Sequence, residues 1–106
     1  LIYANELNEA QFRIYLKNAI KHEKYVIVNF LRTQLHQSGK GHFSPIAAYD
    51  EKTDRFLILD VARYKYPPFW VKTSDLWQSV NTKDGYDYRG FIIISFPLQT
   101  SDGESL

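Results

Sequence analysis

The stretch that decides the fold is Tyr25-Val26-Ile27-Val28-Asn29-Phe30-Leu31. It is almost continuously apolar and rich in β-branched residues, which is typical of a strand buried in a sheet. The residues before it repeat their apolar side chains at helical spacing, so the pattern changes from helix to strand near Glu23. The chain is therefore expected to begin with a helix and to continue as a sheet.

One helix is expected before this strand, after a short lead-in. Asn8 and Gln11 have the spacing of a capping box, in which each side chain binds the backbone N–H of the other residue. The apolar face that follows consists of Phe12, Tyr15, Leu16, Ala19 and Ile20. A separate, mostly basic face carries Glu9, Arg13, Lys17, Lys21 and Lys24. This face is either solvated, with an ion pair between Glu9 and Arg13, or it meets phosphate or an acidic partner.

Two further strand-like runs, residues 42–49 and 55–61, flank a polar turn and predict a β-hairpin. Pro45 lacks the N–H that a central strand needs, so an edge position or a bulge is expected there. The apolar run of residues 90–96 predicts a last buried strand, which Pro97 ends.

Residues 62–72 are aromatic and include two adjacent prolines, which prevent a regular helix or a central strand. Their large rings either cover the core or offer an extended ligand to a partner. A short helix capped near Ser74 is expected next, and its inward-facing residues are Leu76, Trp77 and Val80. The fold class is therefore α+β in a single segment, residues 1–106, with one leading helix, an antiparallel sheet of about four strands and one short helix.

Composition narrows the classes of function. The 106 residues are 44% hydrophobic and 24% charged, which excludes disordered and low-complexity classes. The net charge of +1 gives no electrostatic argument for nucleic acid or an anionic membrane. The chain contains no cysteine, so it holds no disulfide, thiolate metal site or cysteine nucleophile. It also lacks methionine and opens at Leu1, so we expect a piece of a longer protein.

The hairpin offers the most informative geometry for chemistry. A turn centred near residue 51 would place His42 directly opposite Asp60, and a centre at 52 would place them one diagonal step apart on the same face. A carboxylate so placed can orient an imidazole, whose other nitrogen then exchanges a proton with a nucleophile. Asp60 also interrupts an apolar run, where a carboxylate without a partner is costly. Alternatively, Asp60 caps its strand and His42 is an ordinary loop-edge residue.

The remaining histidines carry weaker signals. His22 ends the predicted helix, where a cation suits the helix dipole. His36 lies in a polar loop, and a metal site shared with His42 would lack the cysteine or clustered carboxylates that complete such sites.

The segment Gly41-His42-Phe43-Ser44-Pro45-Ile46, followed by Leu59-Asp60-Val61-Ala62-Arg63-Tyr64-Lys65-Tyr66-Pro67-Pro68-Phe69-Trp70-Val71, closely resembles the phytochelatin synthase family. The resemblance covers most of residues 25–96. It implies a papain-like fold and a Cys–His–Asp triad in that chain order, with His42 as general base and acid and Asp60 as its orienting carboxylate. The cysteine would belong to an earlier, mainly helical half, and this chain would be the sheet-containing half of the domain.

In this family the cysteine thiolate attacks the Cys–Gly bond of glutathione, glycine leaves, and a γ-glutamylcysteinyl thioester remains. The acyl group then passes to a second glutathione, which builds phytochelatins, or to water. The residues that the resemblance places at the substrate site are Gly41, Phe43, Asp84, Arg89, Asn29 and Arg32. Asp84 and Arg89 would hold the γ-glutamyl ammonium and carboxylate, whereas Asn29 and Arg32 have either a binding or a structural role. This chain alone would be inactive, because nothing in it can form the thioester.

The resemblance also sets expectations for cofactors and partners. No cysteine-rich tail follows Phe96, which suggests the short prokaryotic type, inclined toward hydrolysis of glutathione. No tightly bound cofactor is expected, and a divalent heavy metal would act as a thiolate complex of the substrate. The expected partners are glutathione, the cysteine-bearing half and a second copy in a homodimer, and the cytoplasm is the favoured location. Two alternatives stay open: a non-catalytic papain-like binding module, and an unrelated α+β interaction module.

Overall fold

The computed structural model describes residues 1–31, 41–60, 67–84 and 87–95, with the backbone alone for residues 41, 42, 84 and 87. Its helices are a 3₁₀ turn, η1 (Ala4–Glu6), and two α-helices, α1 (Glu9–Lys21) and α2 (Thr73–Val80). Its strands are β1 (Ile2–Tyr3), β2 (Tyr25–Leu31), β3 (Gly41–Asp50), β4 (Arg55–Ile58), β5 (Phe69–Lys72), β6 (Lys83–Asp84), β7 (Asp87–Tyr88) and β8 (Gly90–Ile94).

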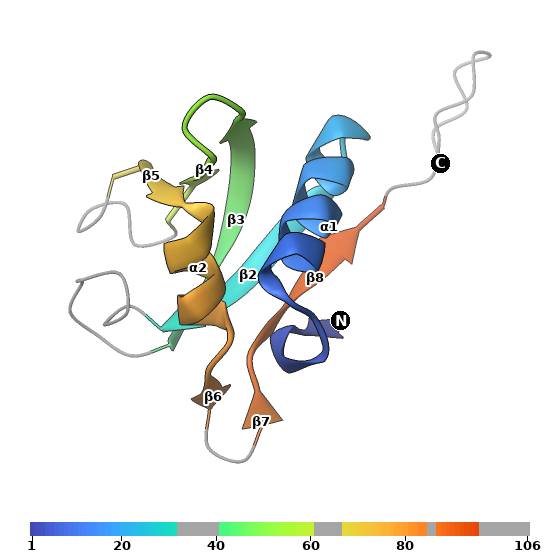
Figure 1. Ribbon diagram of the computed structural model, residues 1–106, viewed down its shortest axis with the longest axis vertical. Coiled ribbons are helices and arrows are strands. Elements are labelled where there is room, and N and C mark those ends of the chain that lie inside the picture. Colours follow the sequence, from blue (N-terminus) through green and yellow to red (C-terminus); the bar gives the residue numbers. More distant parts are fainter. Residues whose placement is uncertain (32–40, 61–66, 85–86, 96–106) are drawn as a thin grey trace.

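Six of these strands form one antiparallel sheet in the order β1-β8-β2-β3-β4-β5, and β6 pairs with β7 in a separate hairpin (Figure 1). The predicted α+β class is confirmed, and β2 has the bounds that the sequence predicts. The main sheet has six strands rather than about four, because the edge strands β1 and β5 have two and four residues and are too short to show a periodic pattern.

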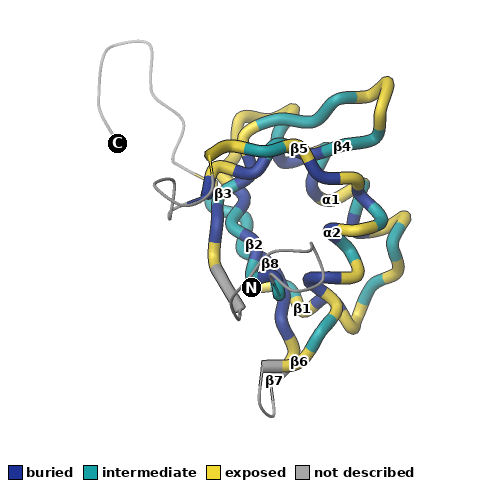
Figure 2. The backbone as a smooth tube through the Cα atoms, turned by 90° about the vertical axis from the view of Figure 1, so that its left-hand side faces the viewer, coloured by how far each residue is buried: buried dark blue, intermediate teal, exposed yellow. Residues whose placement is uncertain are grey.

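Both α-helices pack on one face of the main sheet, which we call the inner face. Figure 2 shows the sheet curving around them, with β2, β3 and β8 on one side and α1 and α2 on the other. The largest fully buried side chains of this core are Phe12, Phe30, Phe56, Phe91, Leu16, Ile58 and Leu76. The Phe12 ring lies at the centre, 5.5 Å from the Phe91 ring and 5.3 Å from the Trp77 ring.

The predicted start of α1 is confirmed. The Gln11 N–H donates to Asn8 Oδ1 at 2.8 Å and the Asn8 N–H donates to Gln11 Oε1 at 2.9 Å, which completes the capping box. The ion pair between Glu9 and Arg13 is also present, at 3.2 Å. Tyr15 departs from the predicted apolar face, since it is 44% exposed.

The hairpin turn is fixed to both helices through Asp54. The Arg13 guanidinium donates to Asp54 Oδ1 from Nε at 2.9 Å and to Oδ2 from Nη2 at 2.7 Å. The hydroxyls of Tyr49 and Thr73 donate to Oδ1 at 2.6 Å and 2.7 Å. Asp54 has a left-handed φ of 52°. This carboxylate therefore joins α1, the β3–β4 hairpin and the start of α2.

The start of α2 differs from the prediction. The helix begins at Thr73 with Lys72 as its N-cap residue and no side-chain cap, so the cap predicted near Ser74 is wrong. Thr73 replaces it with a tertiary contact, since its N–H and hydroxyl both donate to the Asp54 carbonyl, at 2.9 Å and 3.0 Å. The residues predicted to face inward are buried or partly buried: Leu76, Trp77 and Val80.

Pro45 lies in a central strand, so its predicted edge position is wrong. Its carbonyl accepts the Leu59 N–H at 2.9 Å, and both backbone groups of a strand residue face the same neighbour. The missing N–H therefore faces β4, where a bulge between Ile46 and Ala48 interrupts the ladder.

The aromatic stretch after the hairpin also contains more regular structure than predicted. Residues 61–66 lie outside the described residues, but Phe69–Lys72 forms the edge strand β5. Trp70 of this strand is 49% exposed, so its ring does not cover the core.

Candidate functional site

A β-bulge determines on which face of the sheet the first side chains of β3 lie. Next to the turn Ala48 pairs with Leu57, whereas beyond the bulge Ile46 pairs with Ile58, so Ala47 is the extra residue. Side chains alternate between faces along a strand, so one inserted residue turns all earlier side chains of β3 to the opposite face.

The bulge brings the positions of His42 and Asp60 to the same face. The hydrogen bond from Leu59 N–H to the Pro45 carbonyl continues the register past the end of β4. One residue further, Asp60 aligns with Ser44 and lies diagonally from His42. This is the second of the two registers that the sequence allows. Without the bulge, His42 and Asp60 would lie on opposite faces.

Both positions lie at one end of the sheet, on its inner face. Asp60 is 4% exposed and follows the buried Ile58 by two residues. The His42 backbone pairs with Phe30, close to the end of β2. The imidazole lies outside the described part of the chain, so its contact with Asp60 stays a prediction.

Ser44 is a buried polar residue between these two positions that was not predicted from the sequence. It is fully buried, it pairs with Val28 of β2, and its Oγ has no hydrogen-bond partner among the described residues. A buried hydroxyl without a partner costs about 1–3 kcal/mol. The signal in the sequence is a small polar residue at an inward-facing position, two residues after His42.

Replacing Ser44 with alanine is expected to stabilise this chain. The change removes the hydroxyl without a partner and should raise the free energy of unfolding by about 1 kcal/mol. Thermal unfolding followed by circular dichroism measures the shift. Ser79→Ala is the matched control, because Ser79 is equally buried but its hydroxyl donates to the Leu76 carbonyl at 2.7 Å. A lower melting temperature for Ser44→Ala than for the unsubstituted chain would contradict the expectation.

Arg89 and Asn29 meet although 60 positions separate them in the sequence. Arg89 is 5% exposed, and its guanidinium donates to Thr82 Oγ1 from Nε at 2.9 Å and to Asn29 Oδ1 from Nη1 at 3.3 Å. Because a guanidinium only donates, it orients the Asn29 amide with the oxygen toward Arg89 and the NH₂ group away from it. Thr82 was not a candidate from the sequence, and no local pattern marks it.

A hollow of about 220 Å³ lies beside this pair, on the face of the sheet opposite the helices. Its lining includes Asn29, Phe43, Tyr88 and Gly90, from β2, β3, β7 and β8. Gly90 is required here, since a Cβ atom would lie 2.0 Å from the Ile2 carbonyl oxygen of β1. The structure therefore brings two of the predicted substrate residues, Asn29 and Phe43, into one small pocket with Arg89 bound to its wall.

The structure describes less of the other predicted site residues. Gly41 pairs with Leu31 at the start of β3, and Asp84 pairs with Asp87 in the β6–β7 hairpin. For Gly41 and Asp84 the structure describes the backbone alone. Arg32 lies outside the described residues, as does His36.

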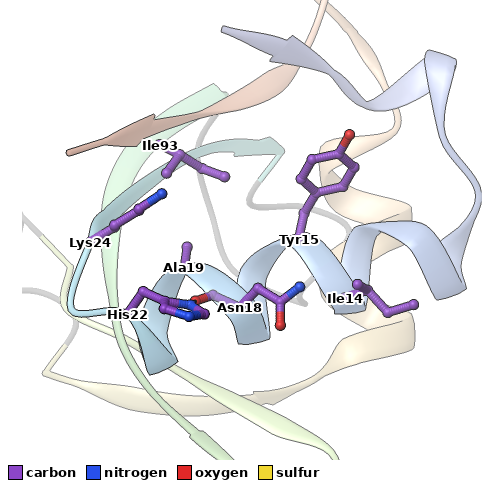
Figure 3. Close-up of a pocket in the computed structure, with 7 residues that line it drawn as sticks. All are labelled: Ile14, Tyr15, Asn18, Ala19, His22, Lys24 and Ile93. Atoms are coloured by element: carbon purple, nitrogen blue, oxygen red, sulfur yellow. The ribbon is translucent and has the colours of Figure 1, made fainter.

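A larger groove, about 470 Å³, lies between the end of α1 and β8, and none of the predicted site residues is in its described lining. Figure 3 shows Ala19 pointing into it from α1, with Lys24 and Ile93 at one end and Tyr15 at the other. The His22 ring lies at its rim, with Nδ1 2.7 Å from the Asn18 carbonyl. The described lining of this groove holds no paired acid and base. The smaller hollow holds two of the predicted substrate residues, Asn29 and Phe43, and is therefore the better candidate.

Neither a metal centre nor a membrane span is found within the described ranges. No group of three or more histidine, aspartate or glutamate side chains there could hold a metal ion. No helix there has the length and apolar character to cross a membrane.

Comparisons with known proteins show which family this chain resembles. The family model described as phytochelatin synthase matches residues 1–91. A glutathione gamma-glutamylcysteinyltransferase of Lotus japonicus is 44% identical over 95 residues, which cover 87% of this chain and 20% of that protein. The Triticum aestivum protein of the same name is 41% identical over 87% of this chain and 19% of its own length, and that of Schizosaccharomyces pombe is 38% identical over 67% and 18%.

The chain spans about a fifth of the length of these curated relatives. The family model covers most of the chain, including the candidate hairpin, the Arg89–Asn29 pair and the first strand of the sheet. On these grounds the chain belongs to the phytochelatin synthase family, whose curated relatives are named as transferases acting on glutathione.

Proposed function

We propose that this chain is the His/Asp-bearing half of a papain-like catalytic domain that cleaves the Cys–Gly bond of glutathione. The observation that carries the proposal is the bulge at Ala47, which gives His42 and Asp60 a common face at one end of the sheet. An acid–base pair in such a position needs a nucleophile from elsewhere, because this chain has no cysteine. The nucleophile would come from polypeptide outside this chain.

In the proposed reaction, His42 accepts the proton of that cysteine thiol, and the thiolate attacks the carbonyl carbon of the Cys–Gly bond. The imidazolium then donates its proton to the departing amine of glycine, which leaves a γ-glutamylcysteinyl thioester. Asp60 holds the imidazole in the orientation and tautomer that this transfer requires. Attack by a second glutathione extends the peptide, and attack by water gives γ-glutamylcysteine.

The hollow that Asn29 and Phe43 line, on the face of the sheet opposite that of His42, is the proposed site of the γ-glutamyl group. Asn29 supports this role, since its amide oxygen is held by Arg89 and its NH₂ group remains to donate to the substrate. Phe43 forms part of the wall, 56% exposed. Arg89 is deeply buried, so it acts on the substrate from beneath the pocket, through charge and through Asn29. Gly41, Arg32 and Asp84 complete the proposed set.

Heavy metal enters this proposal only through the substrate. The metal would arrive as a thiolate complex of glutathione, and the pocket would bind the γ-glutamyl part of that complex. No residue of this chain is assigned as a metal ligand.

The longer protein, meaning this chain together with its cysteine-bearing part, tests the proposal directly. Incubation with glutathione, with and without cadmium, should release glycine and yield phytochelatins or γ-glutamylcysteine, which mass spectrometry distinguishes. The 106-residue chain alone should release none, because no group in it can form the thioester. Glycine release by the chain alone would refute the mechanism, and a longer protein that binds glutathione without turnover would favour a binding module.

A further inference from the structure

Ser44 carries a buried hydroxyl that the reaction proposed above does not use. It lies on the inner face of β3, it is fully buried, and its Oγ has no hydrogen-bond partner among the described residues. Buried polar side chains nearly always have a partner, and an exception in a native protein requires an explanation. Folds keep such costly groups mainly at functional sites. The positions around Ser44 indicate which group its hydroxyl serves.

Four positions of the inner face adjoin Ser44, because β3 lies between β2 and β4 (Figure 1). Val28 of β2 is its partner on one side, and Ile46 follows it by two residues along β3. Both of these residues are apolar and buried. The other two positions carry polar residues: His42, two residues earlier along β3, and Asp60, which follows β4. Ser44 therefore adjoins both members of the proposed acid–base pair.

Asp60 is the nearer of these two polar positions. The Leu59 N–H donates to the Pro45 carbonyl, so these two residues form a hydrogen-bonded pair, and Asp60 and Ser44 form the next, non-hydrogen-bonded pair. Such a pair brings side chains closest, with Cα atoms about 4.5 Å apart. Residues two apart on one strand, as Ser44 and His42 are, lie about 6.6 Å apart. Rotation about the Cα–Cβ bond of Ser44 can therefore direct its hydroxyl toward the Asp60 carboxylate.

We propose that Ser44 is a positioning residue, whose hydroxyl donates to the Asp60 carboxylate during the reaction. This inference rests on the function proposed above. An ionised carboxylate has about four acceptor sites on its two oxygens, so Asp60 can accept from Ser44 and from the imidazole together. The hydroxyl would hold one oxygen and fix the rotation of the carboxylate that orients the imidazole. Hydrogen bonds of this kind often tighten only when substrate is bound, which explains a hydroxyl without a partner in the chain alone.

The Ser44→Ala variant of the longer protein tests this assignment. Its kcat for release of glycine from glutathione should be about tenfold lower than that of the parent, with an unchanged KM, because the lost hydrogen bond acts on the imidazole and not on bound glutathione. Ser79→Ala is the matched control, since Ser79 is equally buried and its hydroxyl donates to the Leu76 carbonyl. This control should keep the kcat of the parent. Because Ser44→Ala is expected to stabilise the 106-residue chain, its slower rate would not come from a damaged fold.

A double-mutant cycle shows whether Ser44 acts through Asp60. In the Asp60→Ala background, Ser44→Ala should slow glycine release by at most about twofold, because the hydroxyl no longer has a carboxylate to position. A further tenfold loss in that background would show that Ser44 acts independently of Asp60, and it would overturn the inference.

The outcomes separate this inference from the proposed function. A Ser44→Ala variant with the kcat of the parent overturns the inference and leaves the proposed reaction intact. A raised KM with an unchanged kcat also overturns it, since the hydroxyl would then contribute to binding of the substrate. A longer protein that releases no glycine from glutathione refutes the proposed reaction, and the assignment of Ser44 with it.

Discussion

The His42→Ala variant of the longer protein is expected to release glycine from glutathione about 10³-fold more slowly than the parent. The imidazole is proposed both to form the thiolate and to protonate the leaving amine, and no other described group near Asp60 can do both. The rate of glycine release at saturating glutathione measures the effect.

His22→Ala is the matched control for this variant. His22 is exposed at the end of α1, where its Nδ1 atom lies 2.7 Å from the Asn18 carbonyl oxygen, far along the chain from the candidate hairpin. Its replacement should leave the rate unchanged. Position 42 lies at the end of a strand, so His42→Ala should also keep the far-ultraviolet circular dichroism of the parent. A folded His42→Ala variant with near-normal turnover would remove His42 from the mechanism.

Replacing Asp54 with asparagine should destabilise this chain strongly. The variant loses the bidentate ion pair between Asp54 and Arg13. Its amide NH₂ group also takes the place of one carboxylate oxygen, so it faces a group that still needs an acceptor. The side chain of Asp54 is 43% exposed, so water replaces part of what is lost. We expect a decrease of about 2 kcal/mol in the free energy of unfolding, measured by urea denaturation.

Asp54 also determines how the stability of the chain decreases at acid pH. The Arg13 guanidinium, helped by the hydroxyls of Tyr49 and Thr73, holds the pKa of Asp54 well below its usual value. A lowered folded pKa contributes stability that is fully present above the unfolded value, about 4, and is lost as the pH falls through the folded value. The stability of the parent should therefore decrease below pH 4 more steeply than that of Asp54→Asn.

Tyr49 gives the opposite dependence on pH: the stability that it contributes is lost at alkaline pH. Burial, together with its hydrogen bond to Asp54, raises the pKa of Tyr49 to about 12. Its contribution is therefore present below the usual tyrosine value, about 10, and is lost as the pH rises through about 12.

Asp50→Asn controls for the removal of a carboxylate from the same turn. Asp50 accepts hydrogen bonds from turn groups of its own hairpin, the Thr53 hydroxyl and the Lys52 N–H. The control should lose less stability than Asp54→Asn and keep the acid limb of the parent. Equal losses for the two variants would show that Asp54 does not join the helices to the hairpin.

Local patterns predicted the elements that local interactions determine. The capping box at Asn8 and the bounds of β2 were predictable because side chains within a few positions fix them. The cap of α2 was not, because Thr73 finds its partner in Asp54, 19 positions earlier. The strand β5 was not either, since four residues after a proline pair become a strand only through β4.

The arrangement of the candidate site was likewise predictable only in part. The two predicted turn centres, residues 51 and 52, each put His42 and Asp60 on one face. The observed turn, in which Asp50 pairs with Arg55, does so only through the bulge at Ala47. The sequence suggested an edge position or a bulge at Pro45 instead. The bond between Arg89 and Asn29 depends on the pairing of β8 with β2, which no short-range pattern specifies.

His42 and Asp60 are proposed to serve a thiol supplied by another part of the protein. Intact-mass spectrometry of the longer protein after brief exposure to glutathione tests it most directly. The account predicts one γ-glutamylcysteinyl group bound as a thioester, released by hydroxylamine, and absent from the His42→Ala variant. An unmodified protein that nevertheless releases glycine, or an equal amount of thioester in His42→Ala, would contradict it.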